Sequence, residues 1–128
     1  MKLVLITGAT KGIGRSTAFD FANAGWDLIL LARDLKLLET IKSELSTTKS
    51  KVYLIKCDLS DSKTIDDCLS EVITEIGCPS VVINNAGFAY NGDLVGMPLI
   101  NWETIMQVNL TSVFQICSFL VPYMRQKG

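Results

Sequence analysis

The sequence predicts an α/β protein in which helices cover both faces of a parallel, doubly wound sheet. Four short runs of apolar residues, each suited to a strand buried on both faces, alternate with segments whose apolar residues recur at helical spacing. The first apolar run leads directly into a glycine-rich turn. Because strands and helices alternate, we expect right-handed crossovers and parallel strands.

The elements follow one another without a repeat, linker or low-complexity tract. The expected strands are residues 3–6, 28–31, 52–55 and 81–83. The expected helices are residues 13–24, 35–45, 65–76 and about 101–126. Gly25 is a natural stop for the first helix, and Gly77 with Pro79 ends the third.

The last expected helix is apolar nearly all round from Val108 to Val121. A helix of this kind is buried on more than one side. One side can cover the sheet, and the other needs further chain, another subunit, or both. Pro122 removes the hydrogen bond to the Ser118 carbonyl, which predicts a kink or an early end of the helix.

Length and composition predict one globular domain with a real core. The chain has 128 residues, of which 48% are hydrophobic and 20% charged. The net charge of -1 gives no positive excess that would attract nucleic acid or an anionic membrane. No uninterrupted run of about 18 apolar residues occurs, so no membrane-spanning helix is expected. The apolar start is too short for a signal peptide.

The chain contains four cysteines and no histidine, which excludes several kinds of site. Cys57, Cys68, Cys78 and Cys117 form no C-x-x-C pair, so a zinc site lacks its usual ligands. A Ser-His-Asp or Cys-His hydrolase is excluded as well. Since no secretion signal is expected, we expect reduced thiols and a cytoplasmic location. The simplest role for each cysteine is that of a small buried hydrophobe.

The turn after the first strand has the glycine spacing G-x-x-x-G-x-G over residues 8–14. Gly8 allows a tight turn, Gly12 leaves room for phosphates near the backbone, and Gly14 permits close contact between helix and strand. A pyrophosphate would then lie at a helix N-terminus, facing free N–H groups. The alternative interpretation is an ordinary glycine turn without a ligand. A P-loop is disfavoured, because the pattern G-x-x-x-x-G-K-[ST] does not occur here.

Three further motifs follow in order along the chain. Cys57-Asp58-Leu59 comes after the third strand, Asn84-Asn85-Ala86-Gly87 after the fourth, and Asn109 interrupts the apolar helix. With Thr7-Gly8 and Gly12-Ile13-Gly14, they resemble the N-terminal half of a short-chain dehydrogenase/reductase. The resemblance covers essentially the whole chain.

The resemblance implies a Rossmann-type sheet with strand order 3-2-1-4, in which the fourth strand lies at an edge. It also implies that this fold holds a dinucleotide site. Asn109 is the expected catalytic residue, holding a water in a proton relay. The expected cofactor-binding residues are Gly8, Thr10, Lys11, Gly12, Ile13, Gly14, Arg33, Asp58, Leu59, Asn85, Ala86 and Gly87.

Each later motif also has a purely structural interpretation. Asp58 could cap the turn into the next helix. Asn84 and Asn85 could be turn residues, with Gly87 at positive φ. Asn109 could satisfy its polar side chain by local hydrogen bonds, since burial without a partner would cost ~1–3 kcal/mol.

The end of the second strand predicts NADP(H) rather than NAD. A count of about 20 residues from the glycine motif reaches Asp34, but the strand ends at Leu31 and Asp34 is better placed to cap the next helix. Ala32 offers no carboxylate to repel a 2′-phosphate. Arg33 offers a planar fork that matches phosphate, and Lys11 adds a second positive charge. The alternative interpretation is that Arg33 and Lys11 are solvated surface charges that bind no phosphate.

The resemblance implies a Ser, a Tyr and a Lys that lie beyond this chain, so Gly128 looks like a truncation point. Tyr123 and Lys127 have the spacing Y-x-x-x-K. Tyr123, however, lies about 21 Å along the helix from Asn109, at 1.5 Å per residue. We therefore expect this pair not to be catalytic.

The expected function is that of an NADP-dependent oxidoreductase acting on a small carbonyl or alcohol substrate. Residues 1–128 would form its NAD(P)-binding domain, inactive alone, with no metal, nucleic acid or membrane partner. A homodimer or homotetramer through the helix around residues 108–121 is expected. The alternative is a non-catalytic dinucleotide-binding or interaction module. Epimerase and dehydratase relatives are disfavoured by the N-N-A-G motif and Asn109.

Overall fold

In the computed structural model, which describes residues 2–128, four parallel strands form one sheet in the order β3-β2-β1-β4. The strands are β1 (Leu3–Thr7), β2 (Asp27–Ala32), β3 (Val52–Lys56) and β4 (Val81–Ile83). The expected fold class, strand order and strand direction are confirmed. Within residues 2–128, β4 pairs with β1 alone and forms one edge of the sheet.

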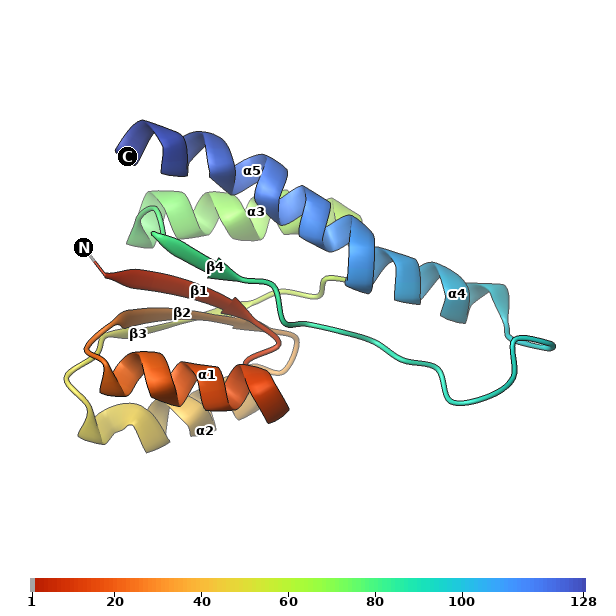
Figure 1. Cartoon of the computed structure of the whole chain (residues 1–128), viewed down its shortest axis with the longest axis horizontal. Coiled ribbons are helices and arrows are strands. Elements are labelled where there is room, and N and C mark those ends of the chain that lie inside the picture. Colours follow the sequence, from red (N-terminus) through yellow and green to blue (C-terminus); the bar gives the residue numbers. More distant parts are fainter. Residues whose placement is uncertain (1) are drawn as a thin grey trace.

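Helices cover both faces of this sheet (Figure 1). One face carries α1 (Gly12–Asn23) and α2 (Leu35–Glu44), and the other carries α3 (Ser62–Glu71) and α5 (Ser112–Lys127). Shorter segments are the 3₁₀ turn η1 (Leu45–Thr47), the π-helical turns η2 (Val72–Ile76) and η3 (Gln107–Thr111), and the helix α4 (Leu99–Met106).

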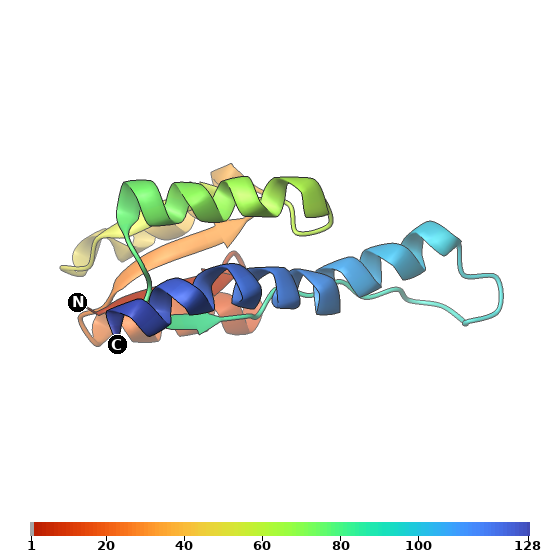
Figure 2. The same ribbon diagram turned by 90° about the horizontal axis from the view of Figure 1, so that it is seen from above.

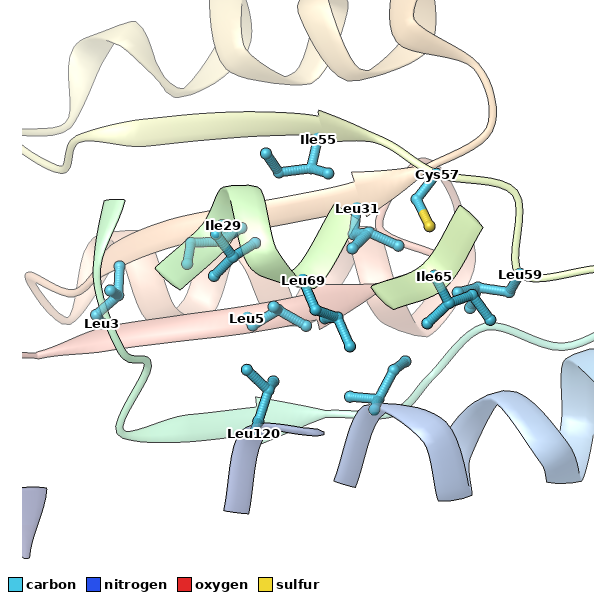
Figure 3. Close-up of a cluster of buried hydrophobic side chains, with 12 residues drawn as sticks. Leu3, Leu5, Ile29, Leu31, Ile55, Cys57, Leu59, Ile65, Leu69 and Leu120 are labelled. Carbon is cyan, nitrogen blue, oxygen red and sulfur yellow. The ribbon is translucent and has the colours of Figure 1, made fainter. Parts of the chain in front are cut away.

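Alternate residues of the strands supply two separate cores. Leu3 and Leu5 belong to a core on one face that also contains Ile65 and Leu69 of α3 (Figure 3). Val4 and Ile6 pack on the opposite face, under α1 and α2. All of these side chains are fully buried or nearly so, because successive residues of a strand point to opposite faces and both faces are covered.

The helix ends follow local chemistry. Gly25 takes a φ of 81° just after α1, and its N–H donates to the Ala22 carbonyl. Asp34 caps α2, its carboxylate accepting from the Leu37 N–H at 3.2 Å. Gly77, with a φ of 129°, ends η2. The two glycine stops and the Asp34 cap at the start of α2 lie where the sequence predicts them.

The last helical stretch runs without a break from Leu99 to Lys127 (Figure 2). It passes through Pro122, so the early end that a proline allows does not occur. Pro122 and Ser118 are both exposed, and water can satisfy the carbonyl that the proline leaves without a donor.

By length and composition alone, this stretch could cross a membrane, and 17% of its most apolar window is buried. The expectation that no helix could span a membrane is therefore not confirmed, because polar residues interrupt the apolar run without making the whole stretch polar. One such helix is weak evidence, because the core helix of a globular protein meets the same test. Ile116 and Leu120 of α5 are buried against the sheet.

Candidate functional site

A cleft of about 630 Å³ opens at the carboxyl ends of the strands. Strands β2 and β4 lie on either side of β1, so the chain order reverses at this point, which is where open α/β sheets bind ligands. The expected site residues that line the cleft are Gly8, Thr10, Lys11, Gly12, Ile13, Arg33, Asp58, Leu59, Asn85, Ala86 and Gly87. Gly14 and Asn109 are the expected site residues that do not line it.

The loop from β1 to α1 requires glycine at two positions for different reasons. Gly8 has a φ of 63°, and a Cβ there would lie 2.8 Å from the Ala86 Cα. At Gly14 a Cβ would overlap the Gly8 carbonyl oxygen and the Asn85 amide nitrogen. Gly14 therefore allows α1 to approach the loop closely, as its spacing predicts.

Gly12 differs from both, because nothing lies within 4 Å of a Cβ placed there. It opens α1, whose preceding residue, Lys11, is extended and makes no side-chain cap. The first N–H groups of α1 thus have no side-chain acceptor, and Gly12 and Ile13 line the cleft. An uncapped N-terminus beside open space fits the phosphates of a dinucleotide.

Thr7 and Asn85 join β1 to the segment after β4. The Thr7 hydroxyl oxygen accepts from the backbone N–H groups of Asn85 and Ala86, both at 3.0 Å. The Asn85 side chain donates to the carbonyls of Thr7 at 3.3 Å and Gly8 at 3.1 Å. Sequence reasoning missed Thr7 as a site-building residue. Its signals were a hydroxyl at the end of an apolar strand and its place directly before Gly8 in the motif.

Gly87 does not take the positive φ that a turn would require, so that interpretation is wrong. The chain after β4 runs on as an irregular extended segment rather than turning back (Figure 1). A Cβ at Gly87 would make an ordinary contact with the Asn109 side chain, at 3.7 Å. The residue lines the cleft without left-handed backbone.

Asn109 lies in η3 and makes two hydrogen bonds to one residue. Its Oδ1 accepts from the Phe88 N–H at 2.7 Å, and its Nδ2 donates to the Phe88 carbonyl at 2.9 Å. Both polar atoms of the side chain are thus satisfied within the protein, but by a residue 21 positions away rather than by the local hydrogen bonds that the structural interpretation expects. Phe88 lines the cleft, so Asn109 supports the wall beside β4.

Asp58 and Leu59 form part of the opposite wall, after β3. Asp58 Oδ1 accepts from the backbone N–H of Ser60 at 3.0 Å and from its hydroxyl at 2.7 Å. Asp61 caps α3, its carboxylate accepting from the Lys63 N–H at 3.1 Å. Asp58 therefore stabilises the turn while a different acid caps the helix.

Lys11 and Arg33 bring two exposed positive charges to the cleft. Within residues 2–128 one ion pair forms, between Arg15 and Glu44, so no carboxylate neutralises either cleft cation. The Asp34 carboxylate is held as the cap of α2, as described above. The arrangement suits a phosphate group.

Four free thiols are present, and only Cys57 lines the cleft. Burial, with lesser contributions from Cys68 and the carboxylates of Asp58 and Asp61, raises the pKa of the Cys57 thiol far above its ordinary value of 9.0. In the part of the chain that the structure describes, no cluster of three or more acidic, Cys or His side chains could hold a metal ion.

Tyr123 and Lys127 lie outside the cleft. The Tyr123 ring lies 5.8 Å from that of Phe119. The Lys127 Nζ donates to the Cys78 carbonyl at 3.1 Å, before the start of β4 and so at the opposite end of that strand from the cleft.

A family model described as short chain dehydrogenase matches residues 2–128. The chain belongs to the short-chain dehydrogenase family. Similar curated members are a 3-oxoacyl-[acyl-carrier-protein] reductase of Thermotoga maritima, 32% identical over 96% of this chain and 50% of the relative, and a sulfoacetaldehyde reductase of Chromohalobacter salexigens, 33% identical over 98% and 49%. The chain spans about half the length of these relatives.

Solved members of the family share the fold. A metagenomic short-chain oxidoreductase in complex with NADP has a TM-score of 0.91 and 29% identity, over 96% of this chain and 56% of that one. The L-sorbose reductase of Gluconobacter frateurii, in complex with NADPH and L-sorbose, has a TM-score of 0.93 and 26% identity, over 99% and 49%.

Proposed function

We propose that the protein binds NADP(H) and acts as an oxidoreductase that moves a hydride between the nicotinamide and a carbonyl or alcohol carbon. One observation carries the proposal: the uncapped N-terminus of α1 opens into the same cleft as Lys11 and Arg33. A helix N-terminus attracts a diphosphate, and two cations without carboxylate partners attract the additional 2′-phosphate of NADP.

The residues of the cleft divide the cofactor site into regions. Gly12 and Ile13 would hold the diphosphate at the start of α1. Arg33 and Lys11 would bind the 2′-phosphate. Asp58 and Leu59 would flank the adenosine, and residues 85–88 would form the wall beside the nicotinamide.

When bound, the nicotinamide would supply or accept the hydride. The described residues bind and orient the cofactor. Asn109 holds the Phe88 backbone and thereby fixes the wall beside β4. We assign its side chain a positioning role, because both of its polar atoms are engaged by Phe88.

The named relatives support the substrate class. The reductases of similar sequence act on a 3-oxoacyl group and on sulfoacetaldehyde, and the sorbose reductase holds L-sorbose beside NADPH. Each of these substrates contains a carbonyl carbon that a hydride can reduce. The proposed substrate is therefore a carbonyl compound or the corresponding alcohol rather than one named compound. We also propose a cytoplasmic location for the protein.

We also propose that residues 1–128 alone lack turnover. Of the expected catalytic residues they contain only Asn109, and Tyr123 lies outside the cleft. Purified residues 1–128 should oxidise no NADPH above background with any carbonyl. Turnover that Tyr123→Phe abolishes would show this part of the proposal to be wrong.

The full-length protein tests the proposed function in two steps. Calorimetry should show NADPH binding, and NADPH carrying deuterium at C4 of the nicotinamide should then transfer it to the carbonyl carbon of a ketone from a panel. Absence of NADPH binding contradicts the proposal. Binding without transfer to any carbonyl favours a non-catalytic dinucleotide-binding module.

A further inference from the structure

Two glutamines connect the last helical stretch to the wall of the cleft that follows β3. The Gln107 Nε2 donates to the Leu59 carbonyl at 3.2 Å and to the Gln115 Oε1 at 2.9 Å. The Gln115 Nε2 donates to the Ser62 carbonyl at 3.1 Å. The loop from Leu59 to Ser62 is thus held at both of its ends by one pair of amides.

The π-helical turn η3 explains how two residues eight apart can meet. In a regular α-helix an eight-residue separation leaves side chains about 80° apart around the axis, whereas a seven-residue separation leaves them only about 20° apart. A π turn inserts one residue into the helix. Gln107 is the first residue of η3 and Gln115 lies four residues after its end, so the insertion falls between them and brings them toward the same face.

The pair reaches the wall that the proposed function assigns to the adenosine. Leu59 is buried, lines the cleft, and lies beside Asp58. Apart from those of the two glutamines, the side-chain hydrogen bonds of this loop within residues 2–128 are local: Asp58 accepts from Ser60, and Asp61 caps the start of α3. Besides the packing of Leu59 in the core, the hydrogen bonds of Gln107 and Gln115 therefore tie this loop to the last helical stretch.

The same short turn also supports the other wall. Asn109, two residues after Gln107, holds the backbone of Phe88. Gln107 faces the wall after β3, and Asn109 faces the wall after β4. Both walls are hydrogen-bonded to η3, so this turn sets the separation between them.

We propose that Gln107, braced by Gln115, is a positioning residue for the adenosine half of the cofactor site. The inference rests on the proposed binding of NADP(H). Loss of the Gln107 amide leaves the Leu59 carbonyl without its donor and releases the loop, while Asn109 still holds Phe88. Binding of the adenosine half should weaken, and binding of the nicotinamide half should not change.

The test uses Gln107→Glu in the full-length protein. Glutamate has nearly the same shape but cannot donate at neutral pH, so both donations from Nε2 are lost. Calorimetry should show binding of 2′,5′-ADP weakened roughly three- to tenfold, as expected for a net hydrogen bond. Binding of reduced nicotinamide mononucleotide should be unchanged. Gln126→Glu, an exposed position on the same helix, is the matched control.

Gln107→Met, which lacks both the donor and the added charge, provides a second variant if Gln107→Glu fails to fold. Unchanged 2′,5′-ADP binding in a folded variant overturns the inference while the proposed function stands. Equal weakening for both halves indicates general loosening of the fold and also overturns it. Failure of the unsubstituted protein to bind NADPH or 2′,5′-ADP overturns the proposed function and the inference together.

Discussion

The side chain of Asn109 makes both of its hydrogen bonds to the backbone of Phe88, 21 residues earlier in the chain. The Asn109 Oδ1 accepts from the Phe88 N–H, and the Asn109 Nδ2 donates to the Phe88 carbonyl. The side-chain amide and the backbone groups of Phe88 thus satisfy each other. Phe88 belongs to an extended segment without regular structure. The Asn109 side chain therefore satisfies both backbone hydrogen-bonding groups of Phe88, as a neighbouring strand would do in a sheet.

Replacing Asn109 should loosen the segment around Phe88. Asn109→Ala removes both bonds, and because the site is exposed we expect a loss of about 1 kcal/mol, or a fall of roughly 3–5 °C in Tm for a domain of 128 residues. Thermal unfolding measures it. Asn91→Ala, in an exposed loop, should leave Tm unchanged. Equal Tm values for both variants would contradict a structural role for the pair.

Arg33→Ala should weaken NADPH binding while leaving NADH binding nearly unaffected. A charge-assisted contact to the 2′-phosphate is worth about 1.5–3 kcal/mol, which corresponds to roughly ten- to a hundredfold. Calorimetry on the full-length protein with each cofactor measures the difference, with Lys49→Ala as the control. If the unsubstituted protein binds the two cofactors equally, the predicted preference is wrong.

Alanine at Gly14 and at Gly12 should have different effects. Gly14→Ala drives a Cβ into the Gly8 carbonyl and Asn85, so we expect overpacking to cost about 1–3 kcal/mol of stability. Gly12→Ala meets open space, and its cost comes from the φ of 58° alone, about 1 kcal/mol. Gly12→Ala should also weaken NADPH binding, because its methyl group enters the space for the phosphates. Urea unfolding and calorimetry separate these effects, and equal stabilities would argue against the packing explanation.

The Cys57 thiol should react more slowly than the other three with iodoacetamide at pH 8. Its raised pKa keeps it protonated, and only a thiolate reacts readily. In the unfolded chain the thiol ionises near its ordinary pKa of 9.0, so the folded state binds more protons above that pH. The contribution of Cys57 to stability should therefore fall as pH rises above 9. Peptide mapping that finds Cys57 labelled first would contradict its shielding.

The full-length protein should be a dimer or tetramer through the exposed side of α5. Phe114 on this helix is 70% exposed, and Leu110 in η3 is 60% exposed. Burying a large apolar side chain is worth about 1.5–3 kcal/mol, which favours association. Phe114→Asp should lower the sedimentation coefficient toward that of a monomer, whereas Ser43→Asp, at an exposed position of α2 on the opposite face of the sheet, serves as a control for added charge. A monomer before any substitution would contradict the assembly.

The sequence alone determined the strands, their order and the edge at which the cleft lies. Strands buried on both faces must be apolar at nearly every position, so residues 3–6 and 28–31 are visible as short apolar runs. The glycine spacing after β1 is equally local, because Gly8 and Gly14 are needed where the loop and the start of α1 meet. Helix caps such as Asp34 depend on neighbouring residues and were predicted for the same reason.

The tertiary structure alone decided which polar side chains meet across the cleft. The bonds of Thr7 to Asn85 and of Gln107 to Leu59 join residues 78 and 48 positions apart, and local pattern carries no information about such pairs. The π turn at η3 changes which helix face Gln115 occupies, and no spacing rule for a regular helix anticipates it. Gly87 was expected to turn, but the extended segment held by Asn109 needs no positive φ there. Contacts between distant segments fix these features, so they appear only when the chain is folded.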